Sequence, residues 1–209
     1  MVGGGVTLAQ HEKGGAEKGK PAAAVATCPI SGEPVNLAVS TPTPDGPVFF
    51  CCKDCIAKYK AEAAKFSEKV AAQRKALEGR PKAQVLCPIC QKAADRDVAL
   101  ESGGKTTLFC SEECMNKYKS EPAKYASALA NSYTYQTKCP VMGEEIDPKA
   151  FTTLADGTNV YFCCKGCTKK LFADPAKYAP KLAEQGIAVG AKDLTQAPAD
   201  QPAKGHEGH

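Results

Sequence analysis

Twelve cysteines in this 209-residue sequence fall into three sets of four that share one layout. Each set begins with a Cys-Pro dipeptide, has a second cysteine after a gap of 22, 22 or 23 residues, and has another cysteine four positions beyond that. Thiolate sulfur is a preferred ligand of zinc and of soft ions such as Cu(I). The twelve candidate metal ligands are Cys28, Cys51, Cys52 and Cys55; Cys87, Cys90, Cys110 and Cys114; and Cys139, Cys163, Cys164 and Cys167.

The middle set has the donors of a closed zinc site. Cys87-Pro88-Ile89-Cys90 supplies two sulfurs, and Cys110 and Cys114 supply two more. Four thiolates complete a tetrahedral zinc site. Cysteines four residues apart at the start of a helix point to one side, where the helix N-terminus stabilises the thiolate form that binds metal. The spacing therefore predicts a metal site, and a disulfide pair is the alternative.

The first and third sets lose one sulfur and gain another. Ser31 and Met142 stand in the position of Cys90, and an additional cysteine, Cys52 or Cys164, directly follows the second one. Neighbouring side chains rarely bind one ion without strain in the backbone, so we expect these two sites to be open or three-coordinate. We predict that they hold a more exchangeable ion than the middle site and accept Cu(I) or another soft metal as well as zinc. Met142 either contributes a thioether or packs.

Similarity beyond the cysteines indicates three tandem copies of one unit. An aromatic residue precedes the second cysteine each time, and a related motif lies 11 residues beyond the last one, ending at Phe66, Tyr125 and Tyr178. A unit of about 50 residues is near the lower limit for an independent core, so a metal or disulfide staple is expected. We place units 1, 2 and 3 at 28–78, 84–130 and 136–185, with linkers at 79–81 and 131–134.

Within each unit the pattern predicts a Cys-Pro turn, a β-hairpin and a helix, which is a small α+β, treble-clef-like fold. In unit 2, strands at 97–100 and 106–109 flank Ser102-Gly103-Gly104. In unit 3, strands at 150–154 and 160–162 flank a turn at 156–159. The Pro-rich stretch 41–47 predicts that the hairpin of unit 1 is the least regular.

The helix of each unit begins near its last two cysteines. Pro122 and Pro175 should interrupt the helices of units 2 and 3, with Asp174 as a cap before a new turn. Ala63 replaces this proline in unit 1, so the sequence predicts an unbroken helix that runs toward Leu77.

Both ends of the chain read as disordered segments, a leader at 1–27 and a tail at 186–209. Met1 to Ala9 resembles the end of a secretory signal peptide without its basic start, so the location is either exported, as in the periplasm, or cytoplasmic. The three histidines, His11, His206 and His209, lie in these terminal regions. The chemistry of the three units is therefore expected to be thiol chemistry.

Composition excludes several classes of function. Twenty-seven basic residues are interleaved with 23 acidic ones for a net charge of +4, which is not the strong footprint of a nucleic-acid-binding protein. No stretch approaches the roughly 18 consecutive apolar residues of a membrane-spanning helix. No catalytic Ser-His-Asp set, phosphate loop or pair of catalytic carboxylates stands out, so an enzyme is not expected.

The motifs resemble YHS and TRASH domains, which are small treble-clef-like modules. The resemblance is carried by the Cys-Pro turns at Cys28 and Cys139, by Phe-Cys-Cys-Lys-x-Cys at 50–55 and 162–167, and by the downstream Pro-Ala-Lys-Tyr. It implies metal binding with roles in heavy-metal sensing, trafficking or resistance, and an association with copper transporters. Ser31 and Met142 depart from the four-cysteine form, and the Tyr-His-Ser tripeptide is not present.

Three classes of function remain open from the sequence. The first is a non-enzymatic metal-binding protein with about one zinc ion per unit, whose partners are metal ions and a metal transporter or other metal-handling protein. The second is a thiol-disulfide redox protein that uses the Cys-x-x-Cys pairs Cys52/Cys55 and Cys164/Cys167. The third is a zinc-stabilised adaptor or nucleic-acid-binding module that uses lysine-rich helices.

Overall fold

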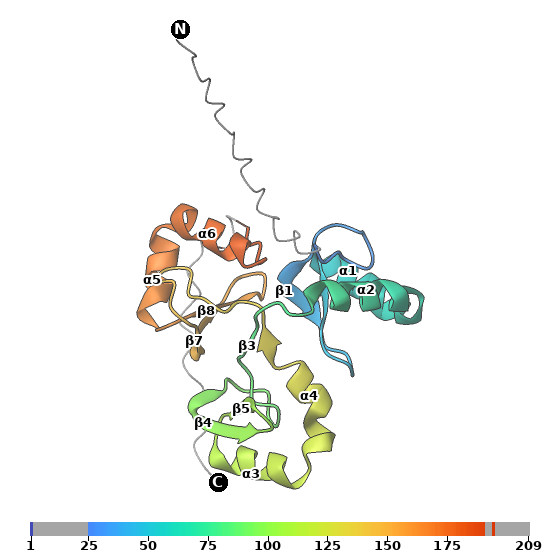
Figure 1. The fold of residues 1–209 in the computed structure, drawn as a ribbon, viewed down its shortest axis with the longest axis vertical. Helices are drawn as coiled ribbons and strands as arrows, with labels where there is room; N and C mark the ends of the chain where they lie inside the picture. The colour runs from blue at the N-terminus through green and yellow to red at the C-terminus, as the bar shows by residue number, and fades with distance from the viewer. Residues whose placement is uncertain (2–24, 191–193, 195–209) are drawn as a thin grey trace.

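The computed structural model describes Met1, residues 25–190 and Leu194. Figure 1 shows three units at the corners of a triangle, with units 1 and 3 beside each other and unit 2 below them. Each unit has a two-stranded antiparallel sheet followed by helical segments, so the fold is small α+β as predicted. None of the described helices is long and apolar enough to cross a bilayer.

The helices and strands follow the same order in each unit. Unit 1 contains β1 (Asn36–Thr41), β2 (Val48–Phe50), α1 (Lys53–Ala61), the 3-10 helix η1 (Ala63–Phe66) and α2 (Ser67–Leu77). Unit 2 contains β4 (Asp95–Ser102), β5 (Lys105–Phe109), α3 (Glu112–Ser120), η2 (Pro122–Tyr125) and α4 (Ala126–Ala130). Unit 3 contains β7 (Asp147–Thr153), β8 (Asn159–Phe162), α5 (Gly166–Ala173) and α6 (Pro175–Glu184). The predicted hairpins of units 2 and 3 are confirmed.

All three hairpins share one irregularity at the start of the first strand. The register shifts after Asn36, Asp95 and Asp147, and the side-chain oxygen of each accepts a hydrogen bond from the backbone N–H two residues later, at 3.1, 3.1 and 2.9 Å. Such Asx turns give the backbone an alternative to the strand ladder and bend the strand. The bulge is therefore common to all units and is not caused by the prolines of unit 1.

The predicted unbroken helix of unit 1 is wrong. Glu62 interrupts it with φ −141°, and Glu121 and Asp174 interrupt the other two helices with φ −140° and −142°. The break brings Phe66 to 6.4 Å from Tyr59 between ring centroids, and the equivalent ring pair of unit 2 has the same separation. Aromatic packing therefore imposes the break in unit 1 without proline, whereas the predicted breaks at the prolines of units 2 and 3 are confirmed.

The last strand of each hairpin carries its aromatic residues on two opposite faces. Phe50, Phe109 and Phe162 are fully buried inside their own units. The residues before two of them point the other way. Phe49 packs on Leu37 and Leu77, with its ring centroid 5.4 Å from that of Tyr135, and Tyr161 packs with Val85 of unit 2. In units 1 and 3 the alternation of the strand thus gives one residue inside the cysteine-bearing core and one that packs on its other side.

The connections around unit 2 form a short sheet. β3 (Ala83–Gln84) pairs antiparallel with β6 (Tyr133–Thr134). The second half of the connection predicted at 131–134 is thus a strand. Each of these strands has only two residues, which is too short for an alternating sequence pattern. Only their pairing with each other defines them as strands.

Unit 3 extends beyond its predicted end at residue 185. The N–H of Leu37 in β1 donates to Gly186 O at 2.8 Å, and the Asn36 side chain donates to Ala188 O at 2.6 Å. Ile187 and Leu194 are each only 1% exposed and join the core of unit 3. These residues of the predicted tail therefore belong to the fold and join units 1 and 3.

The start of the fold also differs from the predicted leader at 1–27. Ala26 is buried, and Thr27 forms a β-bridge with Pro34. The predicted signal-peptide remnant, the three histidines and most of the tail lie outside the described residues.

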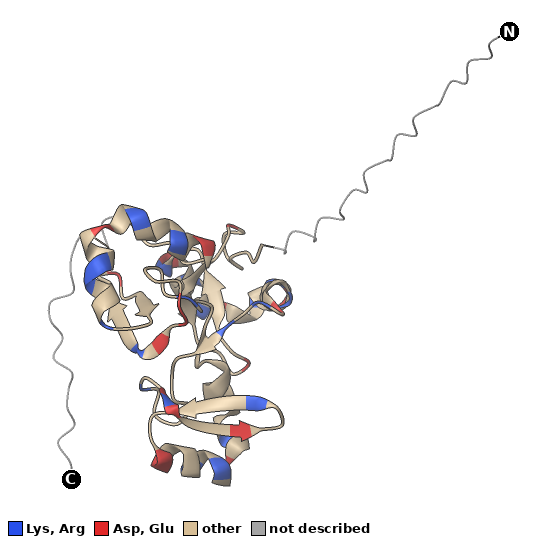
Figure 2. Cartoon of the chain, turned by 60° about the vertical axis from the view of Figure 1, so that its left-hand side comes forward, with Lys and Arg blue, Asp and Glu red and all other residues tan. Residues whose placement is uncertain are grey.

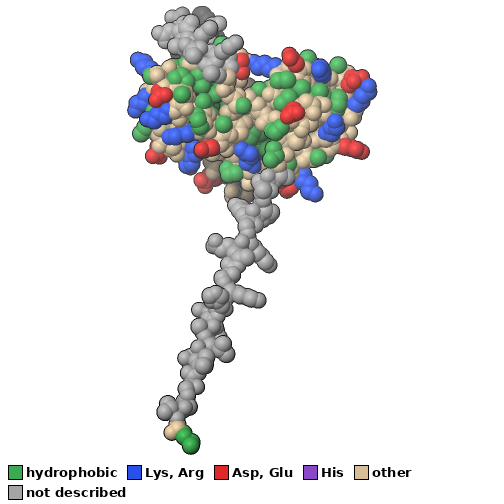
Figure 3. Space-filling view, turned by 90° about the horizontal axis from the view of Figure 1, so that it is seen from above, with side chains coloured by type: hydrophobic (Ala, Val, Ile, Leu, Met, Phe, Trp, Pro, Cys, Tyr) green, Lys and Arg blue, Asp and Glu red, His purple; other side chains and the backbone are tan. Residues whose placement is uncertain are grey.

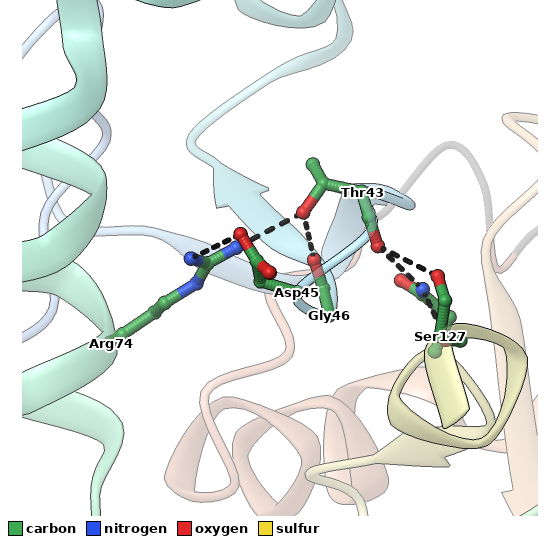
Figure 4. A network of polar contacts seen from close by, with 6 residues as sticks. Thr43, Asp45, Gly46, Arg74 and Ser127 are labelled. Carbon is green, nitrogen blue, oxygen red and sulfur yellow. Dashed lines mark hydrogen bonds and ion pairs between the residues drawn. The ribbon is translucent and has the colours of Figure 1, made fainter. Parts of the chain in front are cut away.

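Polar contacts join unit 1 to unit 2, as Figure 4 shows. Arg74 of α2 donates to Thr43 Oγ1 at 3.0 Å and lies 3.6 Å from the Asp45 carboxylate. The Thr43 carbonyl accepts from Asn131 Nδ2 at 2.8 Å and from Ser127 Oγ at 3.5 Å. The Pro-rich turn of the first hairpin is therefore the contact between these units.

A substitution at Gly186 should reduce stability. The residue has φ +80°, and a Cβ there would lie 2.6 Å from Leu37 Cδ1. We expect Gly186→Ala to lower the free energy of unfolding by about 1–3 kcal/mol, from backbone strain and displacement of the buried leucine. Gly79→Ala is the matched control, since φ is +74° and nothing lies within 4 Å of its Cβ position. Thermal unfolding measures both, and equal effects would contradict the contact.

Candidate metal centres

Each Cys-Pro dipeptide opens a tight knuckle that presents its sulfur inward. In unit 1 the Cys28 N–H donates to Glu33 O at 2.7 Å, and the Gly32 N–H donates to Cys28 O at 2.9 Å. The same two bonds form in the other units, at 2.8 and 2.9 Å around Cys87 and at 2.7 and 2.8 Å around Cys139. These first cysteines are all buried, so the turn fixes one sulfur at the centre of each unit.

The knuckle requires a left-handed residue four positions after the cysteine. Glycine fills this position in units 1 and 3, whereas unit 2 has Gln91 with φ +57°. The Gln91 side chain compensates by donating to Cys87 O at 3.1 Å. The residue before it, Ser31 or Cys90, lies against the second cysteine in units 1 and 2, and in unit 3 it is Met142.

The second group of cysteines comes from the junction of hairpin and helix. The first of them directly follows the aromatic end of β2, β5 or β8, and the last lies in the first turn of the next helix. In unit 2 the residue directly after the first of these cysteines is Ser111, whose Oγ caps α3 by accepting from the Cys114 N–H at 3.4 Å. Cys52 takes this cap position in unit 1 and makes no cap hydrogen bond.

Unit 2 brings four sulfurs together. The Sγ atoms of Cys87, Cys90, Cys110 and Cys114 all lie within 4.8 Å of one another. The Cys90 and Cys110 sulfurs are 3.3 Å apart, and those of Cys110 and Cys114 are 3.5 Å apart. A zinc ion with four sulfurs at about 2.3 Å separates them by about 3.8 Å, so this set fits tetrahedral zinc with small adjustments.

Units 1 and 3 each bring three sulfurs together within the same distance, and the fourth cysteine stands at the rim. The close sets are Cys28, Cys51 and Cys55, and Cys139, Cys163 and Cys167. Cys52 and Cys164 are exposed and outside these sets, although each lies 3.7 Å from the last cysteine of its unit, sulfur to sulfur.

The position of Cys90 is filled differently in the two open sets. Ser31 Oγ lies 3.2 Å from Cys51 Sγ, close to the 3.3 Å between Cys90 and Cys110. Met142 is 56% exposed. Of the two replacements, the serine hydroxyl touches the cluster by hydrogen bonding, and the described contacts of the methionine do not include a cysteine.

Hydrogen bonding favours one thiolate in each cluster. Burial opposes ionisation of Cys28, but hydrogen bonds from the Ser31 backbone and side chain lower its pKa to about 6. Burial also opposes ionisation of Cys87 and Cys139, but backbone hydrogen bonds lower the pKa of both. Burial raises the pKa of Cys110, and it raises that of Cys55 to about 12. Hydrogen bonding thus favours the thiolate form of the first cysteine of each cluster, whereas burial favours the neutral form of Cys55 and Cys110.

Zinc binding should therefore release protons. Burial raises the pKa of both Cys110 and Cys114, so they are protonated at neutral pH without metal and must ionise to bind. Releasing these protons costs less free energy as the pH rises, so affinity rises with pH. We expect the zinc affinity of unit 2 to increase about a hundredfold per pH unit between about pH 6 and 8. Competition with a chelator of known pH dependence measures this slope, and a constant affinity would contradict it.

Three buried glutamines, which the sequence analysis did not single out, hold the metal clusters in shape. Gln73, Gln84 and Gln136 each accept from the N–H of the residue two before the second cysteine, at 2.8–2.9 Å, and donate to the carbonyl of the same residue. Each also donates to the carbonyl before or near its Cys-Pro turn, at 2.9, 3.0 and 3.3 Å. One amide therefore ties the two cysteine-bearing segments together in each unit.

These glutamines reach equivalent positions from different elements. Gln84 and Gln136 each stand three residues before a Cys-Pro dipeptide, but Gln73 comes from the middle of α2. The pattern Gln-x-x-Cys-Pro occurs in units 2 and 3 and could be found in the sequence. The position of Gln73, in contrast, depends on the helix break at Glu62 that orients α2.

Charged side chains are distributed in both signs over the fold. Figure 2 shows both basic and acidic residues on the helices, and the face in Figure 3 mixes apolar, basic and acidic side chains. The ion pairs between these residues include Lys124 with Glu121 at 2.9 Å and Lys149 with Asp95. A single basic face of the kind that binds a phosphate backbone is not formed on the surface in Figure 3.

Comparison with protein families gives one similarity. Residues 82–118 match the MYM-type zinc finger with FCS sequence motif, and they include Phe109-Cys110-Ser111 and all four cysteines of unit 2. Comparison with curated proteins and with solved structures gave no match. The similarity to a zinc finger and the three cysteine clusters together support a zinc-binding module in this chain.

Proposed function

We infer that the protein is a non-enzymatic metal-handling protein with one structural and two exchangeable sites. Unit 2 holds zinc permanently, and units 1 and 3 hold zinc or a soft ion such as Cu(I) for trafficking, sensing or resistance. The observation that supports this division is the number of donors. Four sulfurs lie within 4.8 Å of one another in unit 2, and three do so in each of the other two units. The resemblance to YHS and TRASH domains agrees with this role.

The closed set favours retention of its ion. Four thiolates satisfy the coordination preference of zinc and leave no position for an incoming ligand. In units 1 and 3 the corresponding corner is held by a hydroxyl or an exposed methionine, so a ligand from another molecule can reach the ion. Exchange through such an open position suits a partner that is itself a metal transporter or metal-handling protein.

Metal content and chelator competition test this proposal on native, reduced protein. We expect about three ions per chain, of which two leave to a competing chelator before the third. Thiol mapping by alkylation and mass spectrometry identifies the unit that retains its ion. Equal retention by all three units would contradict the division of roles, and a folded protein that takes up no zinc or Cu(I) would contradict metal binding altogether.

The redox alternative depends on Cys52 and Cys55, whose sulfurs are 3.7 Å apart in Cys-x-x-Cys spacing. Disulfide formation there would remove Cys55 from the cluster with Cys28. Free-thiol titration with and without a chelator distinguishes the two functions, because metal protects thiols reversibly whereas a disulfide needs a reductant. The nucleic-acid alternative predicts salt-dependent binding to random DNA.

A further inference from the structure

The four sulfurs of unit 1 form two triangles with a common edge. Cys51 and Cys55 make this edge, which is 3.7 Å long. Cys28, which is fully buried, completes the inner triangle within 4.8 Å. Cys52 completes an outer triangle, with its sulfur 3.8 Å from Cys51 and 3.7 Å from Cys55. Because Cys52 does not join the inner set, the two triangles open in different directions, one into the core and one toward solvent.

The outer triangle has the size of a metal site. Its three sides are 3.8, 3.7 and 3.7 Å, so an ion at its centre lies about 2.2 Å from each sulfur, close to the metal–sulfur distance of about 2.3 Å in thiolate sites. Three thiolates in a plane suit a soft monovalent ion, and Cu(I) is the soft ion that thiolate ligands select.

Unit 3 repeats two sides of this outer triangle, and unit 2 lacks its third sulfur. The Cys167 sulfur lies 3.8 Å from Cys163 and 3.7 Å from Cys164, and Cys164 is exposed. In unit 2 the equivalent position is Ser111, whose oxygen is used to cap α3. Units 1 and 3 thus each place an exposed sulfur beside the last cysteine of the cluster, whereas unit 2 has no sulfur at this position.

We propose that Cys51, Cys52 and Cys55, and likewise Cys163, Cys164 and Cys167, form a second, solvent-facing thiolate site through which Cu(I) reaches and leaves the buried site. This inference rests on the proposed function. The ion moves by ligand exchange: its bond to the Cys52 sulfur breaks and a bond to the Cys28 sulfur forms, while Cys51 and Cys55 stay bound. The ion keeps its charge, and a proton on Cys28, where present, passes to water.

Thiol mapping of the loaded protein tests the position of Cys52 and Cys164. The full chain receives one Cu(I) per unit under anaerobic conditions, reacts with iodoacetamide and is mapped by mass spectrometry. We expect modification at these two cysteines and protection of the other ten. Protection of Cys52 equal to that of Cys28 would make it an ordinary fourth ligand and overturn the inference alone. Modification of all twelve cysteines would overturn the proposed function with it.

Uptake kinetics test the route itself. Cu(I) is delivered from its bicinchoninate complex to the full chain and to the double variant Cys52→Ser/Cys164→Ser. We expect uptake by the variant to be at least about tenfold slower, with Cu(I) affinity within about threefold, because the solvent-facing site lowers the barrier without holding the ion. Unchanged uptake by the variant would overturn the proposal, whatever its affinity for Cu(I).

Ser40→Ala is the matched control in the same unit. It removes an exposed hydroxyl of β1 and leaves both triangles intact. Its uptake rate should equal that of the unmodified protein, and a rate as slow as that of the double variant would overturn the assignment to Cys52. Thermal unfolding of the zinc-loaded proteins verifies that every variant folds.

Discussion

We expect removal of metal from the reduced protein to unfold unit 2 before unit 3. The two helices of unit 2, α3 and α4, contain no buried residue, and its buried apolar side chains are few: Val85, Cys87, Ala94 and Phe109. Unit 3 has a continuous core that includes Leu171, Leu182 and Ile187. Structural zinc contributes about 10–16 kcal/mol to the folding of small zinc modules. Unit 2, with the smallest apolar core, therefore depends most on its ion.

Hydrogen exchange with a chelator present measures this prediction. We expect the amides of β5 and α3 to lose protection, while those of β8 and α5 keep a measurable part of theirs. Cys87→Ser should produce the same pattern without a chelator, because it removes a fully buried ligand. Cys52→Ser is the matched control at an exposed position and should leave unit 2 unchanged. Retained protection of β5 after metal removal would contradict the dependence.

An exchange of two side chains should convert an open site into a closed one. Ser31→Cys with Cys52→Ser gives unit 1 the donors of unit 2, because Ser31 Oγ already lies where the Cys90 sulfur lies relative to the second cysteine. The new serine can also cap α1, as Ser111 caps α3. We expect metal loss from unit 1 to a chelator to slow by about 10–100-fold, the usual effect of altering a metal site by one group.

The reciprocal exchange provides the control for this prediction. Cys90→Ser with Ser111→Cys gives unit 2 the donors of unit 1, and it should lose zinc faster by a similar factor. Stopped-flow chelation measures both rates, and isotope-coded alkylation assigns them to units. Equal rates in the original and exchanged proteins would show that donor arrangement does not control exchange.

Much of each metal cluster could be predicted from sequence because its ligands belong to local patterns. A Cys-Pro knuckle and a cysteine in the first helical turn are each defined by fewer than about ten residues, and hairpin pairing joins them. The glycine turns of units 2 and 3 and the Asp174 cap were predicted for the same reason, and Asp174 accepts from the Lys177 N–H at 3.3 Å.

The errors concern features that depend on contacts between distant segments. The break at Glu62 follows from packing of Phe66 on Tyr59, not from the propensity of the local sequence, which favours a continuous helix. Ile187 and Leu194 stand in a polar, Ala-rich segment, and only the core of unit 3 gives them a role.

The pairing of β3 with β6 has a consequence for how such a chain can change over evolution. The polypeptide enters and leaves the middle module at neighbouring points, Ala83 opposite Thr134, while the modules on either side bind each other directly through Leu37 and Gly186. A segment attached by a two-stranded stem can be inserted, lost or replaced without separating its flanking partners. The number of sulfur centres in proteins built this way is thus free to vary while the remaining pair keeps its mutual orientation.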